Sequence, residues 1–210
     1  MEKPQDVNDR YIIDKSEDSI MNLYSTPVYT TQIENFDNVQ NEMFSALNEK
    51  AEFQMNPVWA SHYLTDIFFN LNVIEKFELN AFTVELTKHI QNYCKYLNYN
   101  GNCRITESWF SLFKKGNYGH MHHHGSSDLS GVYYVKTNGE DGNLFFDSPN
   151  PHLGTSKLYH KLTPRHEFKP IEGNLMLFPG WLMHGIQTNT TDNERISLSF
   201  NISFYDILQG

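Results

Sequence analysis

The segment Gly116 to Gly131, GNYGHMHHHGSSDLSG, carries the residues of this sequence with the most evident chemistry. Four of the ten histidines of the chain lie in it, His120, His122, His123 and His124. Imidazole is the commonest metal ligand among side chains, and alternate residues of an extended segment project to the same side. A distant histidine follows at His184, and Arg195 and Ser197 form an Arg-x-Ser sequence beyond it. We therefore predict a metal site built from a near pair of histidines and one distant histidine.

A histidine-rich loop can also be a solvated surface segment without a ligand, so its context matters. The tract runs directly into residues 129–136, LSGVYYVK, a β-branched and aromatic run that is typical of a strand. Histidines at the end of a strand are held in position, whereas those of a long loop are not. We favour the metal site and keep the solvated loop as the alternative. The isolated His62 and His89 are expected to be structural residues.

The composition indicates one globular domain. A chain of 210 residues can build one good core, and an aromatic content of 14% excludes a disordered chain. No apolar run approaches the roughly 20 residues that span a bilayer. Residues 1–20 are polar and charged, which does not indicate a signal peptide. We expect residues 1–20 to be a mobile leader and residues 21–210 to form a single domain.

The charge and the cysteine content restrict the partners and the compartment. A formal net charge of −9 argues against binding to a nucleic-acid backbone. Two cysteines, Cys94 and Cys103, do not make a disulfide framework, so a cytoplasmic location is the simplest expectation. We expect no membrane association, and a homodimer remains an open alternative.

The first half of the chain predicts helices that support a β-rich second half. Residues 22–33 alternate and predict a first strand, and apolar residues at helical spacing predict a short helix from Asn38 onward. We interpret residues 52–72 as loop and turn. A longer amphipathic helix is expected to begin at Asn80, a good N-cap residue, and to stop near Gly101.

The second half predicts a succession of short strands, at residues 104–113, 129–136, 143–147, 174–179 and 195–204. In the last of these, apolar residues alternate with a polar series that begins at Arg195. We expect the apolar face to pack under the helices and the polar face to line the lumen of a small barrel; exposure to solvent is the alternative. The pattern indicates a mainly β fold, a sandwich or barrel, with flanking helices.

A long irregular stretch, residues 148–172, interrupts the strands. It holds four prolines and the basic residues Lys157, Lys161, Arg165 and Lys169. Structureless loops of this length are usually functional or disordered. We interpret it as a lid or substrate loop whose charge would attract an acidic substrate, with a solvated surface loop as the alternative.

The order of these segments resembles that of the Fe(II)- and 2-oxoglutarate-dependent oxygenases. Within them it is similar to the prolyl-4-hydroxylase-type branch and to oxygenases of marine bacteria and their phages. The resemblance is carried by GNYGHMHHH, LSGVYYV, GNLFFDSP, PIEGNLMLFPGWLMHGI and ERISLSFNI, in the family's order. It implies a distorted double-stranded β-helix, a cupin-like jelly roll, with its core at about residues 104–205 and helical support from about residues 21–103.

The resemblance also implies the metal ligands. The family's motif is H-x-D/E followed by a distal histidine. His122 and His184 fall on the two histidine positions, and the acidic position falls on His124. Three imidazoles can still leave coordination positions open for a co-substrate and oxygen, although three histidines also suit zinc. Asp128, the nearest carboxylate, is the alternative third ligand.

The resemblance places Arg195 and Ser197 on the distal carboxylate of 2-oxoglutarate, which a guanidinium can bind through two parallel charge-assisted hydrogen bonds. Tyr134 falls where related hydroxylases place a tyrosine on that carboxylate; the alternative is a core aromatic residue. Ser111 and Asn201 are weaker candidates for the same site. Three aromatic residues are expected in the core or the pocket wall, Trp109, Phe113 and Trp181.

The implied reaction couples the oxidative decarboxylation of 2-oxoglutarate to C–H hydroxylation, with Fe(II), molecular oxygen and supportive ascorbate. No catalytic residue is expected beyond the metal centre. The substrate is a free amino acid, a peptidyl residue or a small metabolite, and fold-level analogy does not choose among them. One rival is a three-histidine cupin-type dioxygenase without 2-oxoglutarate, against which Arg195-x-Ser197 argues. Another is a non-catalytic metal-binding protein on the same fold.

Overall fold

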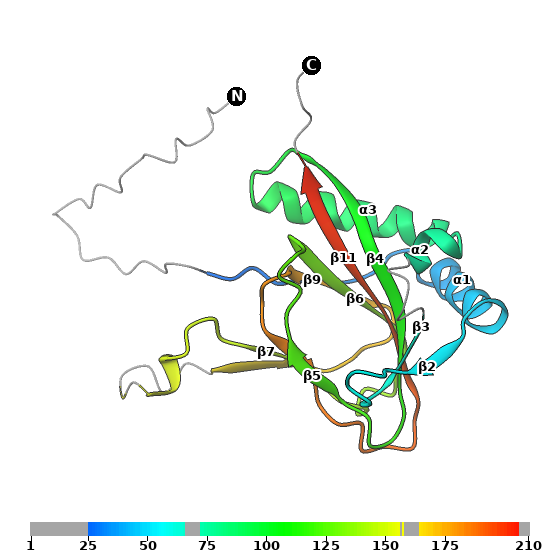
Figure 1. Cartoon of the computed structure of the whole chain (residues 1–210). Coiled ribbons are helices and arrows are strands. Elements are labelled where there is room, and N and C mark those ends of the chain that lie inside the picture. Colours follow the sequence, from blue (N-terminus) through cyan, green and yellow to red (C-terminus); the bar gives the residue numbers. More distant parts are fainter. Residues whose placement is uncertain (1–24, 66–71, 156, 158–163, 206–210) are drawn as a thin grey trace.

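The computed structural model describes residues 25–65, 72–155, 157 and 164–205, and its centre is a large antiparallel sheet (Figure 1). The sheet has seven strands in the order β1-β9-β6-β11-β4-β3-β2. Their bounds are Tyr29–Gln32 for β1, Phe53–Met55 for β2, Tyr63–Thr65 for β3, Asn102–Phe113 for β4, Leu129–Lys136 for β6, Asn174–Pro179 for β9 and Arg195–Tyr205 for β11. The two longest strands, β4 and β11, pair along almost their whole lengths and form the backbone of the sheet.

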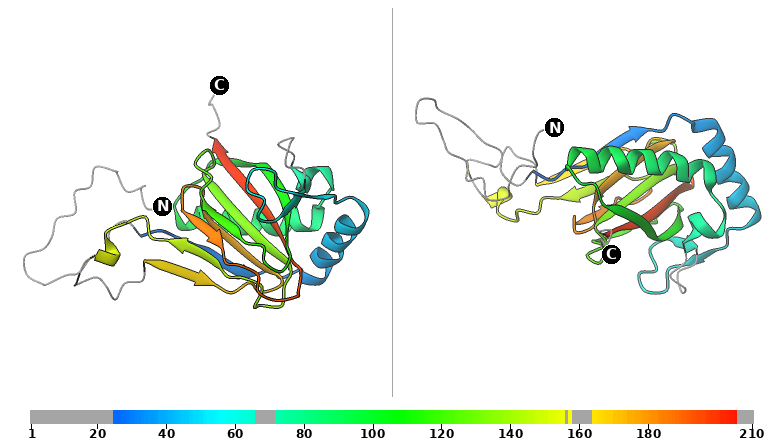
Figure 2. Two further views of the ribbon diagram at one scale, coloured as in Figure 1. Left: turned by 60° about the horizontal axis from the view of Figure 1, so that its bottom comes forward. Right: turned by 90° about the horizontal axis from the view of Figure 1, so that it is seen from above.

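A smaller antiparallel sheet lies against one end of the large one (Figures 1 and 2). Its order is β5-β10-β7-β8, with bounds Gly119–His122 for β5, Leu144–Asp147 for β7, Arg165–Phe168 for β8 and His184–Ile186 for β10. A short 3-10 helix, Leu153–Thr155, lies between β7 and β8. The two sheets therefore form the layers of a jelly-roll sandwich.

Helices cover the other face of the large sheet (Figure 2). They are α1 (Phe36–Glu49), α2 (Val73–Lys76) and α3 (Asn80–Tyr96). Among the described residues, none of the helices has the length and apolar character needed to cross a membrane.

Alternation along the strands separates the two faces of the large sheet. On β11, the apolar series from Ile196 to Phe204 packs with α1 and α3 in the main core, as predicted. On β6, Tyr133 and Val135 join that core, whereas Val132 and Tyr134 face the smaller sheet. The polar series of β11 therefore faces the space between the sheets, and Arg195 within it is completely buried. This excludes the solvent-facing alternative for Arg195.

The structure contains strands in two segments that were interpreted as irregular. Residues 52–72, interpreted as loop and turn, contribute β2 and β3, which extend the edge of the large sheet next to β4. Residues 148–172, interpreted as one irregular loop, contain β8, which pairs with β7. These strands are only three or four residues long, so pairing with a neighbour rather than sequence periodicity defines them. The predicted leader and Lys161 lie outside the described residues.

The start of α3 also departs from the prediction. Asn80 is the first residue of the helix rather than its N-cap, and the N-cap residue Leu79 makes no side-chain capping bond. The free amides of Ala81 and Phe82 instead donate to Oε1 and Oε2 of Glu42, at 2.9 and 3.0 Å. An anionic side chain near the positive end of a helix dipole is favourable. The cap of α3 is thus supplied by α1, a partner that local sequence does not reveal.

Replacing Glu42 by alanine should therefore destabilise the fold. We expect Glu42→Ala to lower the free energy of unfolding by about 1–2 kcal/mol, the usual cost of a lost N-cap, measured by urea unfolding of the metal-free protein. Glu49→Ala on the same helix is the matched control, because Glu49 is exposed and accepts a hydrogen bond from Ser45 of its own helix. Equal losses in the two variants would contradict the capping role.

Candidate metal and carboxylate site

Three histidines converge where the smaller sheet opens between the layers. His122 ends β5 and pairs directly with His184, the first residue of β10. His124 follows two residues after β5, and its backbone N–H donates to the carbonyl of Gly180 at 2.7 Å. One ligand atom from each of the three side chains lies within 4.8 Å of the others. The strand pairing thus joins the predicted near pair to the distant histidine.

Backbone carbonyls orient two of the three rings. The Nδ1 atom of His122 lies 2.7 Å from the carbonyl oxygen of His120, and Nδ1 of His184 lies 2.8 Å from that of Leu182. A carbonyl oxygen only accepts, so each Nδ1 carries the ring proton and each Nε2 has a free lone pair. This is the usual arrangement of metal-binding histidines.

Burial keeps these imidazoles neutral. The pKa of His184 is lowered to about 3, first by burial and then by the nearby His122. The pKa of His124 is lowered to about 4 for the same two reasons in the same order. Burial also lowers the pKa of His122. At neutral pH all three rings are neutral, so each has a nitrogen lone pair that can bind a metal without first losing a proton.

At the other end of the same face, Arg195 lies among hydroxyl groups from neighbouring strands. Ser197 lies opposite Tyr134 of β6 and opposite Ser111 of β4. The guanidinium carbon of Arg195 is 5.0 Å from the ring centre of Tyr134 and 5.2 Å from that of Phe113. The predicted residues Arg195, Ser197, Tyr134 and Ser111 are therefore brought together by β-sheet register.

Most hydrogen-bonding groups of this cluster have no partner. Within the described part of the chain, five buried side-chain polar atoms lack one, and four of them are Nε and Nη2 of Arg195, the Tyr134 hydroxyl and Oγ of Ser197. Each buried unsatisfied group costs about 1–3 kcal/mol. All four can donate, and a carboxylate offers about four lone pairs to donors. The donor set therefore fits a bound carboxylate, with Arg195 as the bidentate partner.

The remaining nitrogen of Arg195 is held by a tight turn. Nη1 donates to the carbonyl oxygen of Gly142 at 2.9 Å. Gly142 has φ of +106°, which favours glycine, and a side chain there would meet the carbonyl of Gln187. The buried carboxylate of Asp141 accepts from Thr137 and Asn193 and so fixes the same turn. This turn aims the free edge of the guanidinium at the lumen.

Arg195 makes no surface ion pair with the nearby carboxylates Asp192 and Glu194, which pair with other cations. Asp192 pairs with Lys115 at 2.9 Å, and Glu194 lies 3.5 Å from Lys114. Arg195 has no exposed surface. Burial lowers its pKa, while Tyr134 and Asp141 act in the opposite direction.

One cavity of about 170 Å³ joins the two clusters. It is lined by residues of both, including Ser111, His122, His124, His184 and Arg195. Trp109 and Phe113 line it as well, in agreement with the predicted pocket-wall role. A ligand in this cavity can contact the histidines at one end and the guanidinium at the other.

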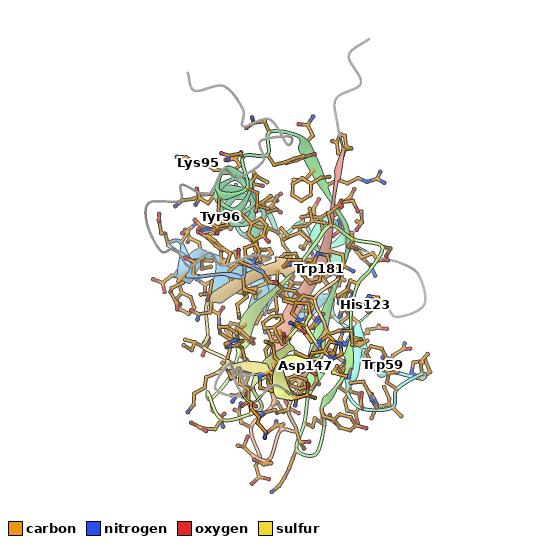
Figure 3. The ribbon with its side chains drawn as sticks, turned by 90° about the vertical axis from the view of Figure 1, so that its left-hand side faces the viewer. Trp59, Lys95, Tyr96, His123, Asp147 and Trp181 are labelled. Carbon is orange, nitrogen blue, oxygen red and sulfur yellow. The ribbon has the colours of Figure 1, made fainter. Side chains whose placement is uncertain are left out.

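Part of the cavity wall was not predicted. Asn56, Trp59 and His62 line it from the segment interpreted as loop and turn. His62 stacks on Phe113 with ring centres 4.6 Å apart, and Trp59 lies 4.9 Å from the ring of His122. Trp59 lies on the face of the molecule shown in Figure 3, together with His123 and Trp181. The aromatic character of the segment was the only sequence signal for this wall.

Several predicted residues lie elsewhere. His123 is exposed, and Trp181 is 51% exposed and lines a separate surface groove, not the core or this cavity. Asp128 accepts from the backbone N–H of Phe204 at 2.8 Å and lines that same groove, so the geometry favours His124 over Asp128 as the third ligand. Asn201 does not join the Arg195 cluster, because its carboxamide bonds to Glu107 and Ser130 near His124.

Comparisons with known proteins agree with this geometry. Residues 107–201 match the model of a family described as "Putative 2OG-Fe(II) oxygenase". No curated protein matches the chain in sequence. No comparison tests the narrower resemblance to oxygenases of marine bacteria and phages, which stays a prediction.

Solved structures share the fold at low sequence identity. HygX from Streptomyces hygroscopicus, with nickel, 2-oxoglutarate and hygromycin B bound, is 13% identical with a TM-score of 0.60, over 85% of this chain and 83% of HygX. A prolyl-4-hydroxylase from Pseudomonas putida is 14% identical with a TM-score of 0.58, over 87% of this chain and 94% of that one. The epimerase SnoN from nogalamycin biosynthesis is 14% identical with a TM-score of 0.60, over 85% of this chain and 76% of its own.

These likenesses confirm the predicted double-stranded β-helix with flanking helices. The family match covers the strands that carry both clusters, from β4 to Asn201 of β11. The family match over residues 107–201 and the shared fold thus make this chain similar to the Fe(II)- and 2-oxoglutarate-dependent oxygenases.

Proposed function

We propose that this chain is an Fe(II)- and 2-oxoglutarate-dependent oxygenase that hydroxylates a C–H bond of a small-molecule or peptidyl substrate. The observation that carries the proposal is the set of four unpaired buried donors on Arg195 and its neighbours, since Arg195 lines one cavity together with the three histidines. A 2-oxoglutarate molecule has a carboxylate at each end. One end suits the donor cluster, and the keto acid at the other end suits a metal held by the histidines.

The metal-binding role falls to His122, His124 and His184. Three neutral imidazoles on one side of a metal leave its remaining positions open for the co-substrate and oxygen. The usual ligand set includes a carboxylate, so this set carries one negative charge fewer. Three imidazoles also suit zinc, and the donor cluster at Arg195 is what favours iron chemistry with 2-oxoglutarate.

The distal carboxylate of 2-oxoglutarate is assigned to Arg195, Tyr134 and Ser197. Arg195 supplies a bidentate charge-assisted pair, and the two hydroxyls donate to the remaining lone pairs. Ser111, opposite Ser197 and on the cavity wall, is a further neighbour of this carboxylate. Binding would satisfy groups whose burial otherwise opposes folding.

When bound, iron, 2-oxoglutarate and oxygen supply the oxidative decarboxylation that is coupled to C–H oxidation. The protein holds the co-substrate in one orientation through Arg195. Its aromatic wall limits the access of water to the cavity. Trp59, Trp109 and Phe113 form part of that wall. We assign no proton transfer to a side chain of this site.

The type of reaction and the class of substrate are both part of this proposal. Hydroxylation is the outcome we propose, although an epimerase shares the fold. The prolyl-4-hydroxylase and HygX support a peptide or a small molecule as the substrate class. Ascorbate is expected to support turnover by keeping the iron reduced.

The all-imidazole ligand set favours one other candidate, a cupin-type dioxygenase that uses metal and oxygen without 2-oxoglutarate. That reading leaves the Arg195 donors unpaired, since such an enzyme needs no second anionic group in the cavity. The two candidates differ in whether 2-oxoglutarate is consumed.

Consumption of 2-oxoglutarate tests the proposed function directly. Wild-type protein with Fe(II), ascorbate and oxygen should form succinate from 2-oxoglutarate, even slowly and without the prime substrate. Tyr134→Phe removes a single donor and should raise the KM for 2-oxoglutarate on the order of tenfold. Lys115→Ala, a surface cation paired with Asp192, is the control and should change nothing. If the wild-type protein forms no succinate at millimolar 2-oxoglutarate, the proposed function is wrong.

Metal content tests the ligand assignment. His122→Ala and His184→Ala should each abolish the uptake of one metal per chain, measured by elemental analysis after anaerobic loading and dialysis. His123→Ala should retain it, because alternate residues of an extended segment face opposite sides and His123 is exposed. If His123→Ala loses the metal and His122→Ala keeps it, the ligand register is wrong by one residue.

A further inference from the structure

We propose that the hydroxyl group of Ser199 binds the keto-acid end of 2-oxoglutarate, by donating a hydrogen bond to the carboxylate next to the keto group. This inference rests on the proposed function, because it presupposes that 2-oxoglutarate lies in the cavity with its distal carboxylate on Arg195. It adds a co-substrate-binding residue at the end of the cavity where the histidines lie.

Ser199 is a half-buried residue in the middle of β11, and its side chain faces the cavity. Strand alternation places it on the same face as the buried residues Arg195, Ser197 and Asn201. β6 and β4 pair with β11 on its two sides, and helices cover the opposite face of the sheet (Figure 2). Ser199 lines the cavity of about 170 Å³, so the cavity accounts for its exposed surface.

The hydroxyl of Ser199 has no hydrogen-bond partner in the described part of the chain. Directly opposite it on the neighbouring strands lie Trp109 of β4 and Val132 of β6, which both line the cavity. An indole only donates and a valine side chain does neither, so no side chain beside Ser199 on these strands can accept its proton. The hydroxyl is therefore a free donor on the cavity wall.

Strand register places Ser199 between the anion cluster and the histidines. Ser197 belongs to the unpaired donor cluster at Arg195. Ser199 lies two residues further, about 6.6 Å along the strand, opposite Trp109, whose ring centre is 5.8 Å from that of His124. This step is comparable to the separation of the two carboxylates in an extended five-carbon dicarboxylate. A co-substrate with its distal carboxylate at Ser197 thus has its keto-acid end near Ser199.

A hydroxyl donor suits the keto-acid end of the co-substrate. A carboxylate has two oxygens, so one of them can accept from the cavity wall while the other binds a metal. Hydrogen bonds to ionised acceptors are stronger than those between neutral groups. A bond from Ser199 would hold the keto-acid end against β11, in addition to the contacts that hold the distal carboxylate.

The test compares the binding of two keto acids to protein loaded anaerobically with Fe(II), measured by the visible absorption that Fe(II) gains when a keto acid binds to it. 2-Oxopentanoate has the keto-acid end of 2-oxoglutarate and a methyl group in place of the distal carboxylate. Ser199→Ala should weaken the binding of both compounds by the same factor, roughly tenfold, because one hydrogen bond to a charged group is lost. Tyr134→Phe, at the distal end, should weaken only the binding of 2-oxoglutarate. Where 2-oxopentanoate does not saturate the protein, the initial slopes of the titrations are compared.

Ser203→Ala is the matched control, because Ser203 lies on the same strand and face but does not line the cavity. It should bind both keto acids as the wild type does. The melting temperature of the metal-free protein gives a second readout. Ser199→Ala should melt at the wild-type temperature, since the hydroxyl has no partner in the described part of the chain to lose.

Three results would overturn the inference and leave the proposed function intact. Unchanged binding of both keto acids by Ser199→Ala would mean that the hydroxyl contacts only water. A loss confined to 2-oxoglutarate would place Ser199 at the distal carboxylate instead. A lower melting temperature of metal-free Ser199→Ala would indicate a structural role. If wild-type protein with Fe(II) gains no absorption on addition of 2-oxoglutarate, the proposed function itself fails.

Discussion

Arg195 carries its positive charge with no exposed surface, and two of its guanidinium nitrogens have no hydrogen-bond partner within the described residues. A buried cation without a partner opposes folding, so the surrounding structure must hold it in place. The turn at Gly142 fixes Nη1, and the register of β4, β6 and β11 places the hydroxyls of Tyr134 and Ser197 beside the free edge. An anion with two oxygens, bound next to Arg195, would give the unpaired donors of this cluster their hydrogen-bond partners.

The same long strand connects this end of the cavity to the metal end. β11 begins at Arg195 and reaches Asn201 six residues later, where the carboxamide meets His124. The smaller sheet supplies the other ligands, because β5 and β10 pair at His122 and His184. Strand register thus fixes the separation between the anion cluster and the histidines. A co-substrate with an anionic group at each end would be held at both ends.

The sequence predicted the parts of this site that follow strand alternation or motif order. The alternating residues of β11 and the spacing of His122 and His124 indicated which side chains share a face, and the family resemblance connected them to His184 and Tyr134. Contacts between distant segments were not predictable in this way. The cap of α3 comes from Glu42, and Trp59 and His62 reach the cavity from a segment without periodicity. Asn201 lies on the expected inner face, yet its partner Glu107 became evident only from the pairing of β4 with β11.

The most direct test of this account is a crystal structure of the protein loaded anaerobically with Fe(II) and 2-oxoglutarate. The account predicts one metal with nitrogen atoms of His122, His124 and His184 at about 2.1 Å, the usual length for imidazole ligands. It also predicts one carboxylate of 2-oxoglutarate within hydrogen-bonding distance of Arg195 Nε and Nη2, the Tyr134 hydroxyl and Ser197 Oγ. A 2-oxoglutarate molecule bound elsewhere, with the donors of Arg195 still unpaired, would contradict it.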